Sequence, residues 1–165
     1  MNYFKALLTS RAHSLFLPRK WKDDIQRYVR QHQQGAAGNP EAAPFRRQLD
    51  FWVLALSTAI ARGVTPLASA PSQGGQKFVD TRQVEMSDEL CELLAVVALG
   101  TLGPEDEGIE DPARIIELAN QYAAAGCEEL ILRLRDPDLR LSILDKAIDF
   151  TAELVLVAEE AEASP

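Results

Sequence analysis

Residues 44–63, PFRRQLDFWVLALSTAIARG, form the longest stretch of the chain that is rich in both aromatic and aliphatic side chains, and they predict the central helix of the fold. Pro44 suits a helix entrance, because its missing N–H would have no helical partner there. Gly63 suits the left-handed position that ends a helix. The stretch is too short to cross a membrane and carries Asp50 and Arg62, so we interpret it as a core helix.

Helical spacing divides this stretch into two faces. One face is expected to be core and carries Leu49, Trp52, Val53, Leu56 and Ile60. The other mixes aromatic, aliphatic and arginine groups, as the centres of protein interfaces do. It predicts a partner surface at Phe51, Leu54, Arg47 and Arg62. The alternative is that the apolar residues 2–17 of the same chain cover Phe51, because an apolar terminus needs a surface to pack on.

The composition indicates a globular protein. A chain of 165 residues with 47% hydrophobic residues is long enough to bury a core as one domain without disulfides. Both cysteines, Cys91 and Cys127, lie in apolar helical patterns and are interpreted as small buried hydrophobic residues. The N-terminus has no continuous apolar segment with a cleavage site, and no run approaches membrane-spanning length, so we expect a soluble cytoplasmic protein.

The remaining periodic segments predict an all-α, single-domain bundle of six or seven helices with short helical hairpins. Residues 1–17 are expected to be an apolar arm or short helix, and residues 18–165 the helical domain. Pro18 opens a helix over about 19–33. Gly126 is expected to divide the segment 112–135 into two helices, and a last helix is expected over about 138–160.

Three helix starts are marked by residues that cap helix N-termini. Ser87 precedes an acidic first turn, and Asp111 and Asp136 each stand directly before a proline. These residues predict helices that begin at about 88, 112 and 137.

The longest irregular stretch is 64–86, which contains an alternating segment, KFVDTRQV, at 77–84. This alternation predicts a short strand or a minor β-hairpin. Because long loops in compact domains are often functional, a less favoured hypothesis is an enzyme with a site on this loop. Its candidate residues are Lys77, Asp80, Arg82 and Glu85.

No motif specifies a reaction or a cofactor. The glycines of SQGGQK at 72–77 lack the spacing of a phosphate-binding loop, and His13 and His32 stand at no recognised zinc spacing. The acidic residues 105–111 lack the ligand order of a calcium loop. The segment 115–135 has the outline of a helix-turn-helix, but its second half begins with two glutamates, the wrong charge for phosphates. We therefore predict no catalytic residues, no metal and no cofactor.

Charge is distributed unevenly along the chain. Residues 1–50 hold nine Lys/Arg against four Asp/Glu, a balance of +5, within a chain whose net charge is −8. This basic part could contact phosphates, could dock on an acidic protein surface, or could be a solvated helix face. The candidate phosphate contacts are Arg19, Lys20, Arg27, Arg30, Arg46 and Arg47.

These observations favour two hypotheses for the function of the protein. The first is a non-enzymatic helical interaction protein, a small subunit or adaptor of a larger cytoplasmic assembly, with a protein partner or a second copy of itself. The alternative is a nucleic-acid-associated accessory protein, for example in bacterial DNA processing or defence, that contacts phosphates through the basic N-terminal third.

Overall fold

The computed structural model describes residues 3–29, 43–84 and 86–140. Helices predominate, so the predicted helical class is confirmed, but a small two-stranded sheet is present and a single bundle is not established. The elements are α1 (Tyr3–Thr9), β1 (Ser14–Pro18), η1 (Arg19–Trp21), α2 (Lys22–Tyr28), α3 (Gln48–Arg62), η3 (Pro71–Gln73), β2 (Gly75–Asp80), α4 (Asp88–Leu102), η4 (Glu107–Glu110) and α5 (Pro112–Arg135).

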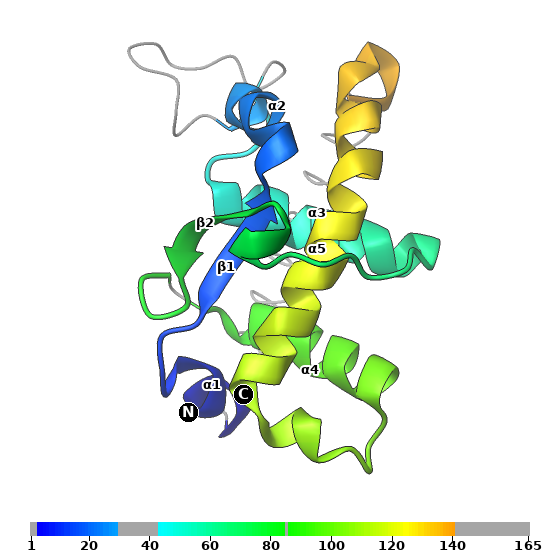
Figure 1. Ribbon diagram of the computed structural model, residues 1–165. Coiled ribbons are helices and arrows are strands. Elements are labelled where there is room, and N and C mark those ends of the chain that lie inside the picture. Colours follow the sequence, from blue (N-terminus) through cyan, green and yellow to red (C-terminus); the bar gives the residue numbers. More distant parts are fainter. Residues whose placement is uncertain (1–2, 30–42, 85, 141–165) are drawn as a thin grey trace, which may run out of the picture.

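Helix α5 is the element on which α3, α4, β1 and η4 pack. It runs the height of the molecule in Figure 1, with α3 crossing it at mid-height and α4 beside its lower half. The prediction that Gly126 divides this segment is wrong, because 24 residues form one uninterrupted helix. Gly126 serves packing instead: a Cβ there would overlap the Ala55 carbonyl oxygen and lie 3.0 Å from the Ala59 amide nitrogen. The missing side chain lets the backbones of α3 and α5 approach closely.

This crossing decides which face of α3 is buried. Leu49, Trp52 and Leu56 of the predicted core stripe are buried, but Ile60 is 41% exposed. Phe51 is 0% exposed, with its ring packed edge-on against Phe45 at a centroid distance of 5.3 Å. The expectation that Phe51 faces outward is therefore wrong: the helix turns its Phe51 side inward together with the small residues that meet α5.

The sheet joins two segments that are distant in the sequence. Strand β1 pairs antiparallel with β2, with an irregularity between Leu15 and Phe16. The predicted strand is confirmed over 77–80, but the hairpin over 77–84 is wrong, since residues 81–84 form a turn and the partner strand is β1. The apolar segment 2–17 contributes helix α1 and most of β1, and it packs on the body through the buried Leu8, Leu15 and Leu17.

The helix starts predicted at Ser87, Asp111 and Asp136 and the predicted end of the central helix are confirmed. The predicted helix entrance at Pro44 is wrong, because α3 begins at Gln48 with Arg47 at its N-cap. The Ser87 hydroxyl accepts from the Leu90 amide, at 3.2 Å, and the Asp111 carboxylate accepts from the Ala113 amide, at 2.9 Å. The Asp136 carboxylate accepts from the Asp138 amide, at 3.0 Å, where the next helical residues begin. Gly63 ends α3 with φ 61°. The helix predicted over 19–33 is only partly confirmed, because η1 covers 19–21, α2 ends at Tyr28, and Val29 is extended and bridges to Phe45. The remainder of that segment and residues 141–160 of the last predicted helix lie outside the described residues.

Candidate docking groove

Helices α3 and α4 form the two sides of an open groove. Each packs on α5, but they share only marginal backbone contact with each other. They run in the same direction, so the N-terminal ends of both helices lie at one end of the groove and the C-terminal ends at the other. Tyr122 of α5 also lines the space between them.

Two hollows make up the groove, and they meet at Leu93 of α4. The hollow near the helix N-termini has a volume of about 540 Å³ and is lined mainly by Leu49, Val53, Ser57, Leu90 and Leu93. The hollow near the C-termini has a volume of about 440 Å³ and is lined mainly by Ile60, Val64, Leu93, Val96, Val97 and Tyr122. The lining is thus mostly aliphatic along the whole length.

The groove has an apolar interior and polar ends. Val96 is 67% exposed and Ile60 41% exposed, one on each wall of the second hollow. At one end, Arg47 pairs with Asp50, with a distance of 3.0 Å between Nη2 and Oδ1. At the other, the hydroxyls of Thr101 and Tyr122 lie 3.2 Å apart. An apolar centre with a polar rim is the usual anatomy of a protein-binding surface.

The groove differs from the partner surface predicted on α3. Phe51 is buried, and Leu54 is partly buried against the core. Arg62 lies outside the groove lining and forms an ion pair with Glu129 at 3.1 Å, while Arg47 stands on the groove rim. The predicted surface and the groove share helix α3, but the prediction did not include the groove-lining Val53, Ser57 and Ile60 as surface residues. A signal for these residues was available in the sequence of α4, which is apolar around most of its circumference.

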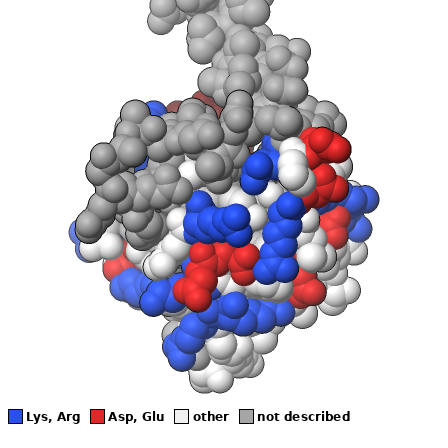
Figure 2. Space-filling model, turned by 90° about the horizontal axis from the view of Figure 1, so that it is seen from above, with Lys and Arg blue, Asp and Glu red and all other residues white. Residues whose placement is uncertain are grey.

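Acidic side chains lie beside some of the candidate phosphate contacts. Arg19, Lys20, Arg27, Arg46 and Arg47 are exposed, and Arg30 lies outside the described residues. Figure 2 shows Lys and Arg interleaved with Asp and Glu on the face seen from above. Lys20 lies 3.2 Å from Glu128, and Arg135 lies 3.0 Å from Asp24 on α2. Neighbouring carboxylates thus reduce the positive potential that phosphates would meet.

The candidate catalytic residues of the loop 64–86 have structural partners. The Asp80 carboxylate accepts from Lys77 Nζ at 2.7 Å and from Ser14 Oγ at 2.8 Å, and these hydrogen bonds hold the pKa of Asp80 below its usual value. Asp80 therefore links the two strands of the sheet. Arg82 is exposed in the following turn, and Glu85 lies outside the described residues.

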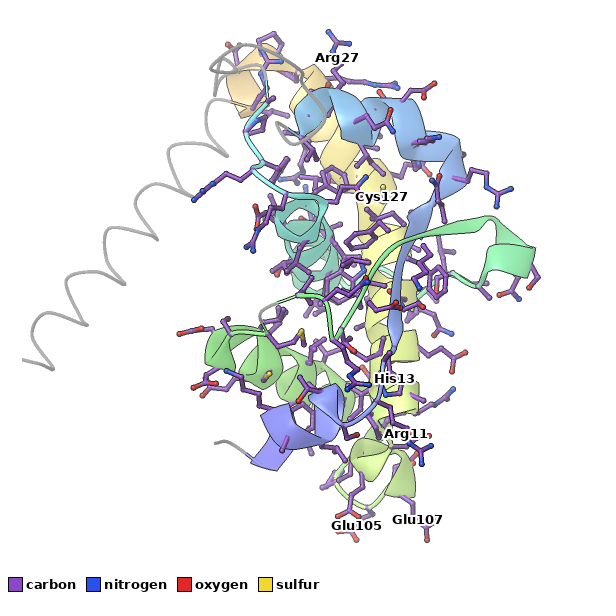
Figure 3. All side chains as sticks on the ribbon, turned by 90° about the vertical axis from the view of Figure 1, so that its left-hand side faces the viewer. Arg11, His13, Arg27, Glu105, Glu107 and Cys127 are labelled. Atoms are coloured by element: carbon purple, nitrogen blue, oxygen red, sulfur yellow. The ribbon has the colours of Figure 1, made fainter. Side chains whose placement is uncertain are left out.

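The described residues bring no metal-ligand set together. Across 3–29, 43–84 and 86–140, no group of three or more His, Cys, Asp or Glu side chains is arranged to hold a metal ion. In the acidic stretch, Asp106 accepts from the Gly108 amide at 2.7 Å and Asp111 begins α5, so both carboxylates cap helical turns. Glu105 and Glu107 point outward at the lower tip of the molecule (Figure 3).

The two cysteines are buried free thiols. Cys127 lies on α5 within the core (Figure 3), and burial raises its pKa to about 12. Burial also raises the pKa of Cys91 on α4. Neither thiol is therefore ionised near neutral pH, and neither is suited to act as a nucleophile.

We expect Cys127 to resist alkylation in the native protein at pH 8, because the reactive species is the thiolate. Ellman's reagent should count two thiols in guanidinium chloride and none that reacts rapidly without it. The raised pKa of Cys127 also predicts that its contribution to stability is complete below the ordinary thiol pKa and is lost as pH rises towards about 12. Rapid modification of Cys127 in the folded protein would contradict its burial.

The fold and the groove together define a mostly helical protein with a small antiparallel sheet and an open apolar groove between two helices. Comparison with known proteins finds no matching family model, no matching curated protein and no matching solved structure. Within the described ranges, no helix combines the length and apolar character that crossing a bilayer requires.

Proposed function

We propose that this chain is a non-enzymatic helical interaction protein, a subunit or adaptor of a larger cytoplasmic assembly, and that it binds an amphipathic helix of a protein partner in the groove between α3 and α4. The observation that carries the proposal is the groove itself, with Val96 67% exposed and Ile60 41% exposed. Large aliphatic side chains that line one concave surface are typical of binding sites, whereas isolated exposed ones are not.

The shape and chemistry of the groove favour a helix as the bound element. Two roughly co-directional helices with an apolar trough between them accept a third helix, which buries its apolar face and leaves its polar face in water. The 15 residues of α3 and the 15 of α4 each extend about 22 Å, which corresponds to about four helical turns of the bound segment. Polar side chains at both ends of the groove, such as Arg47 and Thr101, can form hydrogen bonds with the ends of that segment.

A photo-crosslinking experiment tests the proposal. A benzoylphenylalanine residue replaces Val96 in the full chain, and a matched variant carries it at Leu132, which is 53% exposed on α5 and outside the groove lining. We expect position 96 to yield discrete protein adducts in the producing cell, mapped by mass spectrometry to an amphipathic helical segment.

Binding of the partner should also depend on the apolar character of the groove. Ile60→Asp should remove the adducts at position 96, because a charge in the centre of an apolar interface costs about 2 kcal/mol or more, about thirtyfold in affinity. Leu99→Asp is the matched control, since Leu99 is 46% exposed on α4 outside the groove lining. Adducts that are equal at positions 96 and 132, or that survive Ile60→Asp, would refute the proposal.

A further inference from the structure

The chain itself contains a segment with the properties that the groove requires. Residues 141–165 follow the described part, and within them the apolar side chains recur at helical spacing. The predicted apolar face carries Leu144, Ala147, Ile148, Thr151, Leu154 and Val155. The predicted polar face carries Ser142, Asp145, Lys146, Asp149 and Glu153. Such a helix would bury one side and keep the other in water.

The length of this segment matches the groove. Residues 141–158 would extend about 27 Å as a helix, and α3 and α4, with 15 residues each, extend about 22 Å. One predicted helix could therefore cover both hollows, from the Arg47 end to the Tyr122 end. The rest of the chain, 159–165, is polar apart from alanine and proline and would extend beyond the groove.

Residues 141–158 start far from the groove of their own chain, which favours binding to the groove of another molecule. Tyr122 of α5 lines the groove, and α5 then continues for 13 residues to Arg135, about 20 Å further along its axis. Arg135 is held at that distant end by its ion pair with Asp24 of α2. Figure 1 shows this end of α5 at the top and α4 in the lower half of the molecule.

If residues 141–158 bound the groove of their own chain, part of the segment would be needed to span the distance back to the groove. Covering about 20 Å takes about six residues of extended chain, since each spans about 3.3 Å. Those residues, 141–146, include Leu144 and would leave a helix too short for both hollows. A second copy meets no such constraint, because each molecule can extend its segment into the other and form a closed twofold pair.

We infer that the groove between α3 and α4 binds residues 141–158 of a second copy of this chain, so that two chains exchange their C-terminal segments. The inference rests on the proposed function and names the partner helix. It also accounts for the exposed Val96, which would be covered in the pair.

The experiment uses the full chain and two variants that each remove one half of the contact. Val96→Asp alters the groove at an exposed position, and Ile148→Asp alters the apolar face of the segment. Light scattering after size exclusion should give twice the chain mass of 18.2 kDa for the natural sequence. Each variant alone should raise the dimer dissociation constant at least thirtyfold. Leu99→Asp, outside the groove lining, and Ser142→Asp, on the predicted polar face of the segment, should remain dimeric.

Mixing the two variants separates exchange from other arrangements. The intact groove of the Ile148→Asp chain can bind the intact segment of the Val96→Asp chain, so the mixture should dimerise more strongly than either variant alone. A monomeric natural chain, or a dimer that Ile148→Asp leaves unchanged, would overturn the inference. A monomer whose melting temperature falls with Ile148→Asp would show that the segment binds its own chain, which also overturns exchange.

The proposed function can survive the failure of this inference. If the Val96 crosslinker still captures a different protein in the Ile148→Asp background, the groove binds a foreign helix and only the exchange of segments is refuted. If position 96 forms adducts with neither a second copy nor another protein, both ideas fall together.

Discussion

Gly126→Ala should destabilise the protein by about 2–3 kcal/mol, although alanine is the better helix former. The new Cβ would overlap the carbonyl oxygen of Ala55 and lie 2.8 Å from its carbonyl carbon. Both contacts are backbone atoms within helices, so no flexible side chain can move aside. Helices α3 and α5 would have to separate, and the closely packed core around Phe51 and Trp52 would loosen.

The matched control for this substitution is Gly100→Ala on α4. A Cβ at Gly100 meets nothing within 4 Å, and the residue is helical. Alanine there should stabilise the protein by about 0.5–1 kcal/mol through helix propensity alone. The same chemical change should thus shift the urea midpoint in opposite directions at the two glycines. A Gly126→Ala protein as stable as the natural one would show that α3 and α5 do not cross as closely as described.

Asn120→Leu should cost about 3–5 kcal/mol, because it removes the only side chain that joins β1, α3 and α5 through hydrogen bonds among the described residues. Asn120 is 2% exposed. Its Oδ1 accepts from the Phe16 amide at 2.9 Å and from Trp52 Nε1 at 3.2 Å, and its Nδ2 donates to the Ser14 carbonyl oxygen at 3.0 Å. Leucine would fill similar volume but remove the hydrogen bonds that Asn120 makes with all three partners.

Two measurements separate this effect from a general loss of packing. Gln121→Ala, at the next position, should change stability by less than about 0.5 kcal/mol, since its amide makes only a 3.5 Å contact with Glu117. Hydrogen exchange of the Phe16 amide should accelerate in Asn120→Leu under conditions where the helical core of α5 stays protected. A melting temperature within about 2 °C of the natural protein would mean that the hydrogen bonds of Asn120 contribute little.

The helix ends and the helical class could be predicted because their causes are local. Ser87, Asp111 and Asp136 cap amides two or three residues away, and Gly63 ends α3 through its own φ of 61°. Such short-range hydrogen bonds and backbone preferences can be recognised in a window of a few residues. The burial of the two cysteines was predicted equally well, because each lies in an apolar periodic segment.

The strand β1 and the role of Asn120 could not be predicted in this way. Residues 14–18 are extended because they pair with 75–80 and because the Asn120 amide bonds the backbone of β1 across 104 positions to Phe16. Within its own window, Asn120 is only a polar residue in a helix. No local pattern indicates a hydrogen-bond partner so far away in the chain.

The sequence by itself determined that this protein is mostly helical, that helices begin after Ser87, Asp111 and Asp136, and that the central helix is rich in apolar residues. Only the tertiary structure decided that Phe51 is core and that Ile60 borders a groove. The physical reason is that α3 is apolar around most of its circumference, so its own periodicity leaves several orientations nearly equal in hydrophobic burial. The close approach at Gly126 selects one of them, and it thereby leaves the α3 and α4 surfaces between which we propose that a helix binds.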